Sequence, residues 1–284
     1  MSTQLQSGTE RIAAAFAGSG KRAALMPYLM GGYPTLERSL QIGRACIEAG
    51  ADLIELGMPY SDPLADGPVI HAAGTEALAA GANVVGVLEV ARGLAREVPV
   101  VLMCYVNMVL APGAEAFVAR LAQTGVCGLI VPDLPLEESG EIAAVCERYG
   151  LALVPLIAPT TTPARMSAIG ALAKGFLYAV SVVGTTGERG GGAQADSGMG
   201  AKRVSPESAE RYAEIVARAK ASTEVPVALG FGIGTPSQAR MAADAGADGV
   251  IVGTRLVRAA REDPEHPAGA VGAVVNELAG ALVR

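Results

Sequence analysis

The feature that most constrains the fold is a regular alternation of short apolar segments with longer segments of helical pattern. Eight short runs rich in Val, Ile, Leu and Ala are separated by helix-length stretches. Strands joined through helices pair in parallel, because each helix carries the chain back to the same end of the sheet. The expected strands are Ala23–Met30, Leu53–Gly57, Val98–Cys104, Gly128–Val131, Ala152–Leu156, Phe176–Val180, Val225–Leu229 and Gly249–Val252.

Eight strand–helix units in roughly 260 residues favour a closed (β/α)8 barrel over an open doubly wound sheet. We expect one domain over residues 1–284, since no segment resembles a linker, and a short helix over Glu10–Ala17 before the first strand. Three related segments, Ala49–Ile54, Thr124–Ile130 and Ala245–Ile251, each pass from a helix-ending glycine through a tight turn into a strand. Further helices are expected at Pro34–Ala49, after Pro68, after Asn83, at Ala114–Thr124, Glu137–Tyr149, Pro163–Ala173, Pro206–Ala221 and Pro236–Ala245, and from Pro267 onward.

The composition indicates a compact folded protein and argues against nucleic acid or a membrane as its partner. Hydrophobic residues make up 51% of the chain and charged residues 18%, the reverse of a disordered chain. The net charge of −6 argues against nucleic acid, which usually recruits a basic patch. No uninterrupted apolar run of about 20 residues is present, and Met1–Thr9 is polar rather than signal-like. We therefore expect a cytoplasmic protein that does not enter a membrane.

The residues that hold metals or form Schiff bases are scarce. The four cysteines are widely spaced and only two histidines occur, so a metal site is not expected. A Schiff-base lysine would have to project from the end of a barrel strand, and none of the four lysines follows a strand in this way. Acid–base chemistry by carboxylates is what remains. The lysines are Lys21, Lys174, Lys202 and Lys220.

Residues Ile54–Pro68 are the strongest candidate for a catalytic segment. The segment begins as an apolar strand that contains Glu55, and then becomes a polar loop with Asp62 and Asp66 and three prolines. The fixed φ of proline lowers the entropy lost in holding such a loop in one geometry. A carboxylate at a strand end can also simply cap the next helix. One acidic residue alone would therefore be weak evidence for a catalytic site.

Glycines after the last two strands are typical of a phosphate site. Gly230–Pro236 and Val252–Thr254 each lie between a strand and the segment that follows it. Glycine lets backbone amides approach an anion, and the positive end of a helix dipole attracts it. Ordinary turns, or a dinucleotide-binding loop, are the alternatives, although the latter belongs after the first strand of an open sheet. Val252–Thr254 is expected to begin only a short turn.

The long segment Gly184–Val204 contains seven glycines and few apolar residues. A loop of this length inside a barrel is usually a lid or a disordered segment. We expect it to move.

Taken together, these motifs resemble those of the tryptophan synthase alpha subunit family. The resemblance runs from about Arg11 almost to the C-terminus and includes Ile54–Pro68. The other matching motifs are Tyr28–Pro34, Val131–Pro135, Ala158–Thr160, Gly175–Tyr178, Gly230–Ile233 and Val252–Gly253.

The resemblance implies retro-aldol cleavage of indole-3-glycerol phosphate to indole and glyceraldehyde 3-phosphate. Glu55 would protonate the indole C3 atom and then accept the side-chain hydroxyl proton, and Asp66 would accept the indole N–H. The long loop would close as a lid and bring Thr186 toward Asp66. Phosphate contacts would come from Gly187, Gly232, Gly253 and Thr254, the last replacing the family's serine. Tyr178 is a further candidate for substrate contact, and Tyr28, Met30, Val106 and Phe176 are candidates for the indole pocket.

The resemblance also implies a partner, a beta subunit that carries pyridoxal phosphate, in an alpha2-beta2 tetramer. This chain would itself need no cofactor. Tyr60–Pro68 and Tyr105–Gly113 are the expected contact segments. Two other readings are a free-standing indole-glycerol-phosphate lyase and a catalytically silent subunit that activates or scaffolds a partner.

Overall fold

The strands form a parallel barrel in the computed structural model, which describes residues 6–181 and 206–283. Every pairing between the named strands is parallel, and they follow one another in the order β5-β4-β3-β2-β1-β9-β8-β7-β6, with β1 between β2 and β9. The strands are β1 Ala24–Met30, β2 Ile54–Gly57, β3 Val100–Met103, β4 Gly128–Ile130, β5 Ala152–Val154, β6 Leu156–Ile157, β7 Leu177–Val180, β8 Val227–Gly230 and β9 Gly249–Val252.

The ring closes through one extended run that Pro155 divides into β5 and β6. β5 pairs with β4 on one side, and β6 pairs with β7 on the other. Proline has no N–H to donate, which is why the expected strand Ala152–Leu156 is interrupted. The Pro155 carbonyl still accepts a hydrogen bond from the Tyr178 N–H at 3.0 Å. With β5 and β6 counted as one strand, the described residues form the predicted eight-stranded barrel.

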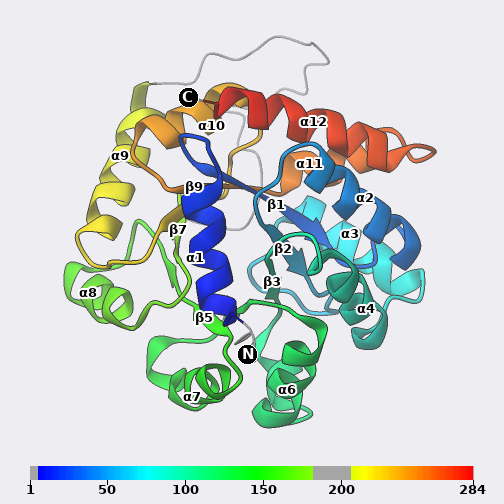
Figure 1. The fold of residues 1–284 in the computed structure, drawn as a ribbon, viewed down its shortest axis with the longest axis horizontal. Coiled ribbons are helices and arrows are strands. Elements are labelled where there is room, and N and C mark those ends of the chain that lie inside the picture. Colours follow the sequence, from blue (N-terminus) through cyan, green and yellow to red (C-terminus); the bar gives the residue numbers. More distant parts are fainter. Residues whose placement is uncertain (1–5, 182–205, 284) are drawn as a thin grey trace, which may run out of the picture.

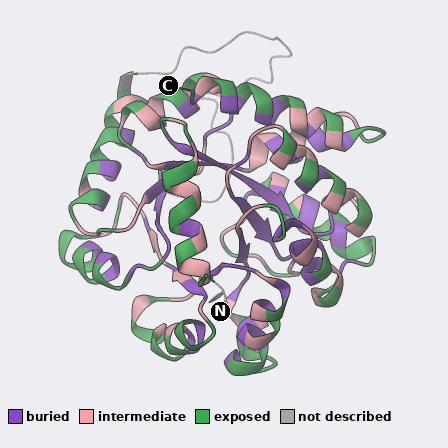
Figure 2. Ribbon diagram, in the orientation of Figure 1, coloured by how far each residue is buried: buried purple, intermediate pink, exposed green. Residues whose placement is uncertain are grey.

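Helices surround the barrel and bury one side of each helix against it (Figures 1 and 2). In Figure 2 the strands are almost entirely buried, whereas the helices are green on their outer side. The helices are α1 Gly8–Gly18, α2 Leu36–Glu48, α3 Pro68–Ala79, α4 Val84–Leu94, α5 Val106–Leu110, α6 Ala114–Thr124, α7 Gly140–Arg148, α8 Pro163–Leu172, α9 Pro206–Lys220, α10 Pro236–Asp244, α11 Thr254–Glu262 and α12 Pro267–Ala281.

The structure corrects the sequence prediction at three helices. The segment after Gly253 is the nine-residue helix α11 and not a short turn. Its apolar residues Leu256, Val257, Ala259 and Ala260 are all buried, at the spacing that places them on one side of a helix. The short helix α5 was not predicted, and α7 begins at Gly140 after a separate 3-10 turn at Leu136–Glu138.

The leading helix α1 covers the end of the barrel where the strands begin. In Figure 1 it lies across the centre of the view, over the strands. Ile12 on α1 is fully buried and packs against Gly128 and Gly175, and Phe16 packs against Gly249. A capping box formed by Ser7 and Glu10 starts the helix. Because α1 blocks this end, access to the barrel is left to the end where the strands finish.

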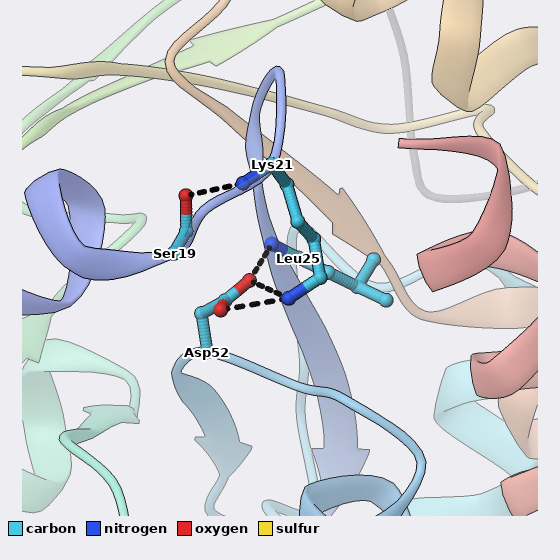
Figure 3. A network of polar contacts seen from close by, with 4 residues as sticks. All are labelled: Ser19, Lys21, Leu25 and Asp52. Atoms are coloured by element: carbon cyan, nitrogen blue, oxygen red, sulfur yellow. Dashed lines mark hydrogen bonds and ion pairs between the residues drawn. The ribbon is translucent and has the colours of Figure 1, made fainter. Parts of the chain in front are cut away.

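Two aspartates at the covered end each accept a hydrogen bond from a backbone N–H of the neighbouring strand. Asp52, just before β2, accepts hydrogen bonds from Leu25 N at 2.7 Å and from Lys21 Nζ at 2.8 and 2.9 Å (Figure 3). Asp248, just before β9, accepts from Val227 N at 2.8 Å and from a second lysine, Lys220. The repeated Ala-Gly-Ala-Asp motif therefore has a structural role at the end of the barrel opposite to the strand ends.

Replacing Asp52 by Ala should destabilise the protein by about 2 kcal/mol, because it leaves the buried Leu25 N–H without an acceptor. Chemical unfolding monitored by circular dichroism measures this change. Glu89, whose side chain is exposed and pairs with Arg92 on α4, provides the control, since loss of an exposed pair costs less than about 0.5 kcal/mol. Equal effects of Asp52→Ala and Glu89→Ala would contradict the role assigned to Asp52.

Within residues 6–181 and 206–283, no single helix is long and apolar enough to span a membrane. Of the described helices, only α3 and α4 taken together have the length and apolar composition of a membrane span, and the chain bends by 110° between them.

Candidate active site

A cavity lies where the barrel strands end, and most of the residues predicted to act on substrate line it. It is lined by residues from β1, β2 and β7 and from the segments after β8 and β9. The predicted site residues that line this cavity are Tyr28, Glu55, Asp66, Tyr178, Gly232, Gly253 and Thr254. The two candidate catalytic carboxylates therefore face one enclosed space.

Glu55 is a buried acid without a counter-charge in the described structure. Its side chain is 1% exposed, and its Oε2 atom has no hydrogen-bond partner among the described residues. Burial disfavours the ionised form. Burial, together with the nearby charge of Asp66, raises the pKa of Glu55 to about 8. At neutral pH this carboxyl group therefore holds a proton that it can donate.

Asp66 occupies a more polar position than Glu55 in the same cavity. Burial raises the pKa of Asp66, while a hydrogen bond from Tyr105 and the proximity of His71 oppose the shift. Tyr105 also accepts a hydrogen bond from Ala65 N at 3.0 Å, and its ring stacks on Tyr60 with centroids 5.4 Å apart. Tyr105 thus fixes the loop that carries Asp66. The two carboxyl groups differ in environment, which is how one site can use one acid as a proton donor and another as an anion.

The helices that follow β8 and β9 differ in whether the backbone N–H groups at their start already have hydrogen-bond acceptors. At α10, Gly234 N and Thr235 N already donate to Gln238 Oε1 at 2.9 and 3.1 Å. At α11, Gly253 and Thr254 line the cavity, and no side chain of the described residues caps the helix. The start of α11 is therefore the better place for an anion, since uncapped amides at a helix start attract negative charge.

Phe231 and Gly232, which directly follow β8, form part of the cavity wall. Both have positive φ, 68° and 78°, which is rare for a residue that carries a side chain. The Phe231 ring packs edge-on against Tyr178 with centroids 5.8 Å apart, and its carbonyl accepts a hydrogen bond from the Ser181 hydroxyl. Phe231 is therefore held in place through its ring by Tyr178 and through its carbonyl by Ser181.

Three candidates for the indole pocket do not line this cavity. Phe176 lies just before β7, near the covered end of the barrel, where it packs against Phe16 of α1 with centroids 5.7 Å apart. Met30 packs toward Gly74 on α3. Val106 starts α5, and its N–H donates to Asp133 at 2.9 Å. The predicted lid Gly184–Val204, with Thr186 and Gly187, lies outside the described residues.

Sequence reasoning did not single out several residues that line the cavity or support it. Tyr105, predicted only as the first residue of a contact segment, lies two residues after the end of β3, so the rule that places sites at strand ends could have identified it. The same rule would have identified Met103, Ile130 and Pro132, which complete the wall at the ends of β3 and β4. Of the lysines in the described segments, Lys21 and Lys220 bind the aspartates at the covered end, and none lines the cavity.

Comparison with known proteins agrees with this architecture. The family model described as tryptophan synthase alpha chain matches residues 15–281. The chain belongs to the tryptophan synthase alpha chain family. The chain is 44% identical to the tryptophan synthase alpha chain of Methanosarcina acetivorans over 264 residues, which cover 93% of this chain and 87% of that one. It is 47% identical to the alpha chain of Synechococcus sp. strain CC9902 over 239 residues, 84% of this chain and 83% of the other.

Solved structures of tryptophan synthase share the fold. A structure of Mycobacterium tuberculosis tryptophan synthase superposes with a TM-score of 0.84 at 35% identity, covering 98% of this chain and 99% of that one. Tryptophan synthase subunit alpha from Legionella pneumophila gives a TM-score of 0.82 at 30% identity, with 98% of both chains covered. The tryptophan synthase alpha chain family is one of lyase-type enzymes, and the barrel described above is its fold.

Proposed function

We propose that this chain cleaves indole-3-glycerol phosphate to indole and glyceraldehyde 3-phosphate, with Glu55 and Asp66 as its catalytic residues. The observation that carries the proposal is the pair of carboxyl groups that face one cavity in unlike environments. A carbon–carbon cleavage of this kind needs a proton delivered to carbon, a proton removed from oxygen and an acceptor for the indole N–H.

In the proposed mechanism, protonated Glu55 donates its proton to the indole C3 atom. Asp66, as a carboxylate, accepts a hydrogen bond from the indole N–H and stabilises the positive charge of the protonated ring. Glu55, now ionised, removes the proton from the hydroxyl on the carbon next to the ring. The C–C bond then breaks, its electrons return to the ring as indole forms, and the oxygen becomes the aldehyde of the second product. Glu55 ends protonated, so the cycle balances without a cofactor in this chain.

The phosphate would lie at the start of α11, with Gly253 and Thr254 beside it and Gly232 opposite. Thr186 and Gly187 keep the roles that the family resemblance gives them, as lid and phosphate contacts. Tyr178 would contact the middle of the substrate, because it lines the cavity between Glu55 and Phe231.

Glycerol phosphate should slow amide exchange at the start of α11 several-fold and leave the start of α10 unchanged, because the N–H groups of Gly234 and Thr235 just before α10 already donate to Gln238 Oε1. Hydrogen–deuterium exchange read by mass spectrometry on peptides covering 253–257 and 234–238 measures this. A peptide from α1, at the covered end, is the internal control. Slowing confined to the α10 peptide would refute the assigned phosphate position.

We further propose a beta subunit as partner, in an alpha2-beta2 tetramer whose beta chains carry pyridoxal phosphate. The expected contact segments 60–68 and 105–113 include Leu64 and Leu110, whose side chains are 76% and 54% exposed. Exposed large apolar side chains beside an active-site mouth are consistent with a docking surface. A cytoplasmic location is part of the same proposal, and the four buried, unpaired cysteines are typical of a reducing compartment.

The test is release of indole from indole-3-glycerol phosphate by the purified chain, alone and with a tryptophan synthase beta subunit. Slow release alone that rises on addition of the beta subunit is the expected result. Rapid release that the beta subunit does not change would instead identify a free-standing lyase. No indole under either condition would identify a silent subunit and refute the proposed reaction.

A further inference from the structure

The cavity contains a second buried polar group, the Tyr28 hydroxyl, that the proposed mechanism does not use. The Tyr28 side chain is 6% exposed. Its hydroxyl and Glu55 Oε2 are the two buried side-chain oxygens without a hydrogen-bond partner among residues 6–181 and 206–283. A buried hydroxyl without a partner costs free energy, and both of these atoms belong to residues that line the same cavity.

Tyr28 and Glu55 lie side by side on neighbouring strands. They are direct partners in the parallel register of β1 and β2, so their side chains leave the sheet about 4.8 Å apart on the same face. They do not bond to each other. One ligand atom between them could therefore contact both.

The glycine two residues after Glu55 makes room for the Tyr28 hydroxyl. A Cβ atom added at Gly57 would come within 3 Å of the Tyr28 ring and closer still to its hydroxyl. The same arrangement recurs across the barrel, where a Cβ atom at Gly230, at the end of β8, would clash with the hydroxyl of Tyr178. Tyr178 also lines the cavity. In both cases a glycine on the neighbouring strand leaves space for a tyrosine hydroxyl at the site.

Tyr28 is suited to donate a hydrogen bond and not to act as a base. Burial, with the nearby carboxyl groups of Asp66 and Glu55, raises the pKa of Tyr28 well above its ordinary value. The phenol therefore keeps its proton at physiological pH, and its hydrogen can point at an oxygen that gains negative charge.

Resting on the function proposed above, we infer that the Tyr28 hydroxyl donates a hydrogen bond to the substrate hydroxyl whose proton Glu55 removes. As that proton leaves and the C–C bond breaks, the oxygen carries developing negative charge, and Tyr28 stabilises it. Glu55 and Tyr28 thus contact one oxygen, the first as acceptor of its proton and the second as a donor to its lone pair.

The test compares Tyr28→Phe with wild type for two ligands. One is indole-3-glycerol phosphate, and the other is indole-3-propanol phosphate, which keeps the indole and the phosphate and lacks both side-chain hydroxyls. We expect kcat/KM for the substrate to fall about tenfold, the effect of one lost hydrogen bond. Binding of the propanol analogue, measured by calorimetry, should change less than about twofold.

The melting temperature of the unliganded protein separates this role from a structural one. Tyr28→Phe removes a hydroxyl that has no partner in the described structure, so the melting temperature should stay the same or rise. Tyr149→Phe, which removes the hydroxyl of a partly exposed tyrosine far from the cavity, is the matched control for kcat/KM. Unchanged cleavage by Tyr28→Phe, an equal loss for both ligands, or a lower melting temperature would each overturn the inference.

The result also separates this inference from the proposed function. If wild type releases indole and Tyr28→Phe releases it equally fast, only the role of Tyr28 fails. If wild type releases no indole, the proposed reaction fails and the role of Tyr28 fails with it.

Discussion

Replacing Glu55 by Gln should lower the rate of indole release on the order of 10³-fold, because the amide can neither give a proton to carbon nor take one from oxygen. Gln has nearly the same shape, so the cavity should keep its form and substrate binding should change little. Steady-state kinetics with indole-3-glycerol phosphate measure the loss in kcat. Glu97→Gln, which changes an exposed carboxyl paired with Arg44, is the control. A Glu55→Gln variant with wild-type kcat would disprove the catalytic assignment.

The same variant should become more stable than wild type as the pH rises. The Glu55 carboxyl has an ordinary pKa of 4.5 and a pKa of about 8 in the folded protein, so folding favours the protonated form. Below about pH 4.5 both states are protonated and Glu55 adds no pH dependence. Between about pH 4.5 and 8 the unfolded chain ionises first, and the stability of wild type falls. Gln cannot ionise, so its advantage should grow across that window, as chemical unfolding at several pH values can show.

Asp66→Asn should lower kcat on the order of 10²-fold, because the neutral amide cannot balance the positive charge of the protonated indole ring. It should also alter the pH profile. In wild type, activity should fall at high pH as Glu55 ionises and at low pH as Asp66 takes up a proton. Loss of the carboxylate in Asp66→Asn should remove the low-pH decline and keep the high-pH one.

The matched control for Asp66 lies in the same loop. Asp62 is exposed and its carboxylate accepts a hydrogen bond from the Ser61 hydroxyl at 2.5 Å. In the isolated chain, Asp62→Asn should leave kcat within about twofold of wild type, as surface substitutions usually do. If both variants lost activity equally, the effect would belong to the loop as a whole and not to the Asp66 carboxylate.

The positions of the strands could be predicted from sequence because the physical signal is local. A short β-branched run between two helices has few alternatives, and a parallel barrel then places every strand end at one rim. The same reasoning places Glu55 and Asp66 at one end of the barrel, where both line the cavity. The interruption at Pro155 was also visible in principle, since proline lacks the N–H that a strand needs.

The supporting contacts could not be predicted in this way because they join residues that are far apart in the chain. Tyr105 meets Ala65 across 40 positions, and no local pattern links them. Phe176 and Met30 look like pocket residues by type and position along the strand. Whether such a side chain faces the cavity or a packed helix depends on where the strand begins and ends, and the sequence leaves that uncertain by a few residues.

The interruption at Pro155 gives the barrel one weak seam. β5 and β6 together contribute five residues to the ring, whereas β1 alone contributes seven, and a groove between α7 and α8 exposes part of the seam at Leu153, Pro155 and Leu156. A closed ring of strands opens first where the fewest backbone bonds hold it and where water can reach them. Local opening of this barrel should therefore start on the side opposite β1, so that β1 and β2, which carry Tyr28 and Glu55, stay rigid while the opposite wall loosens.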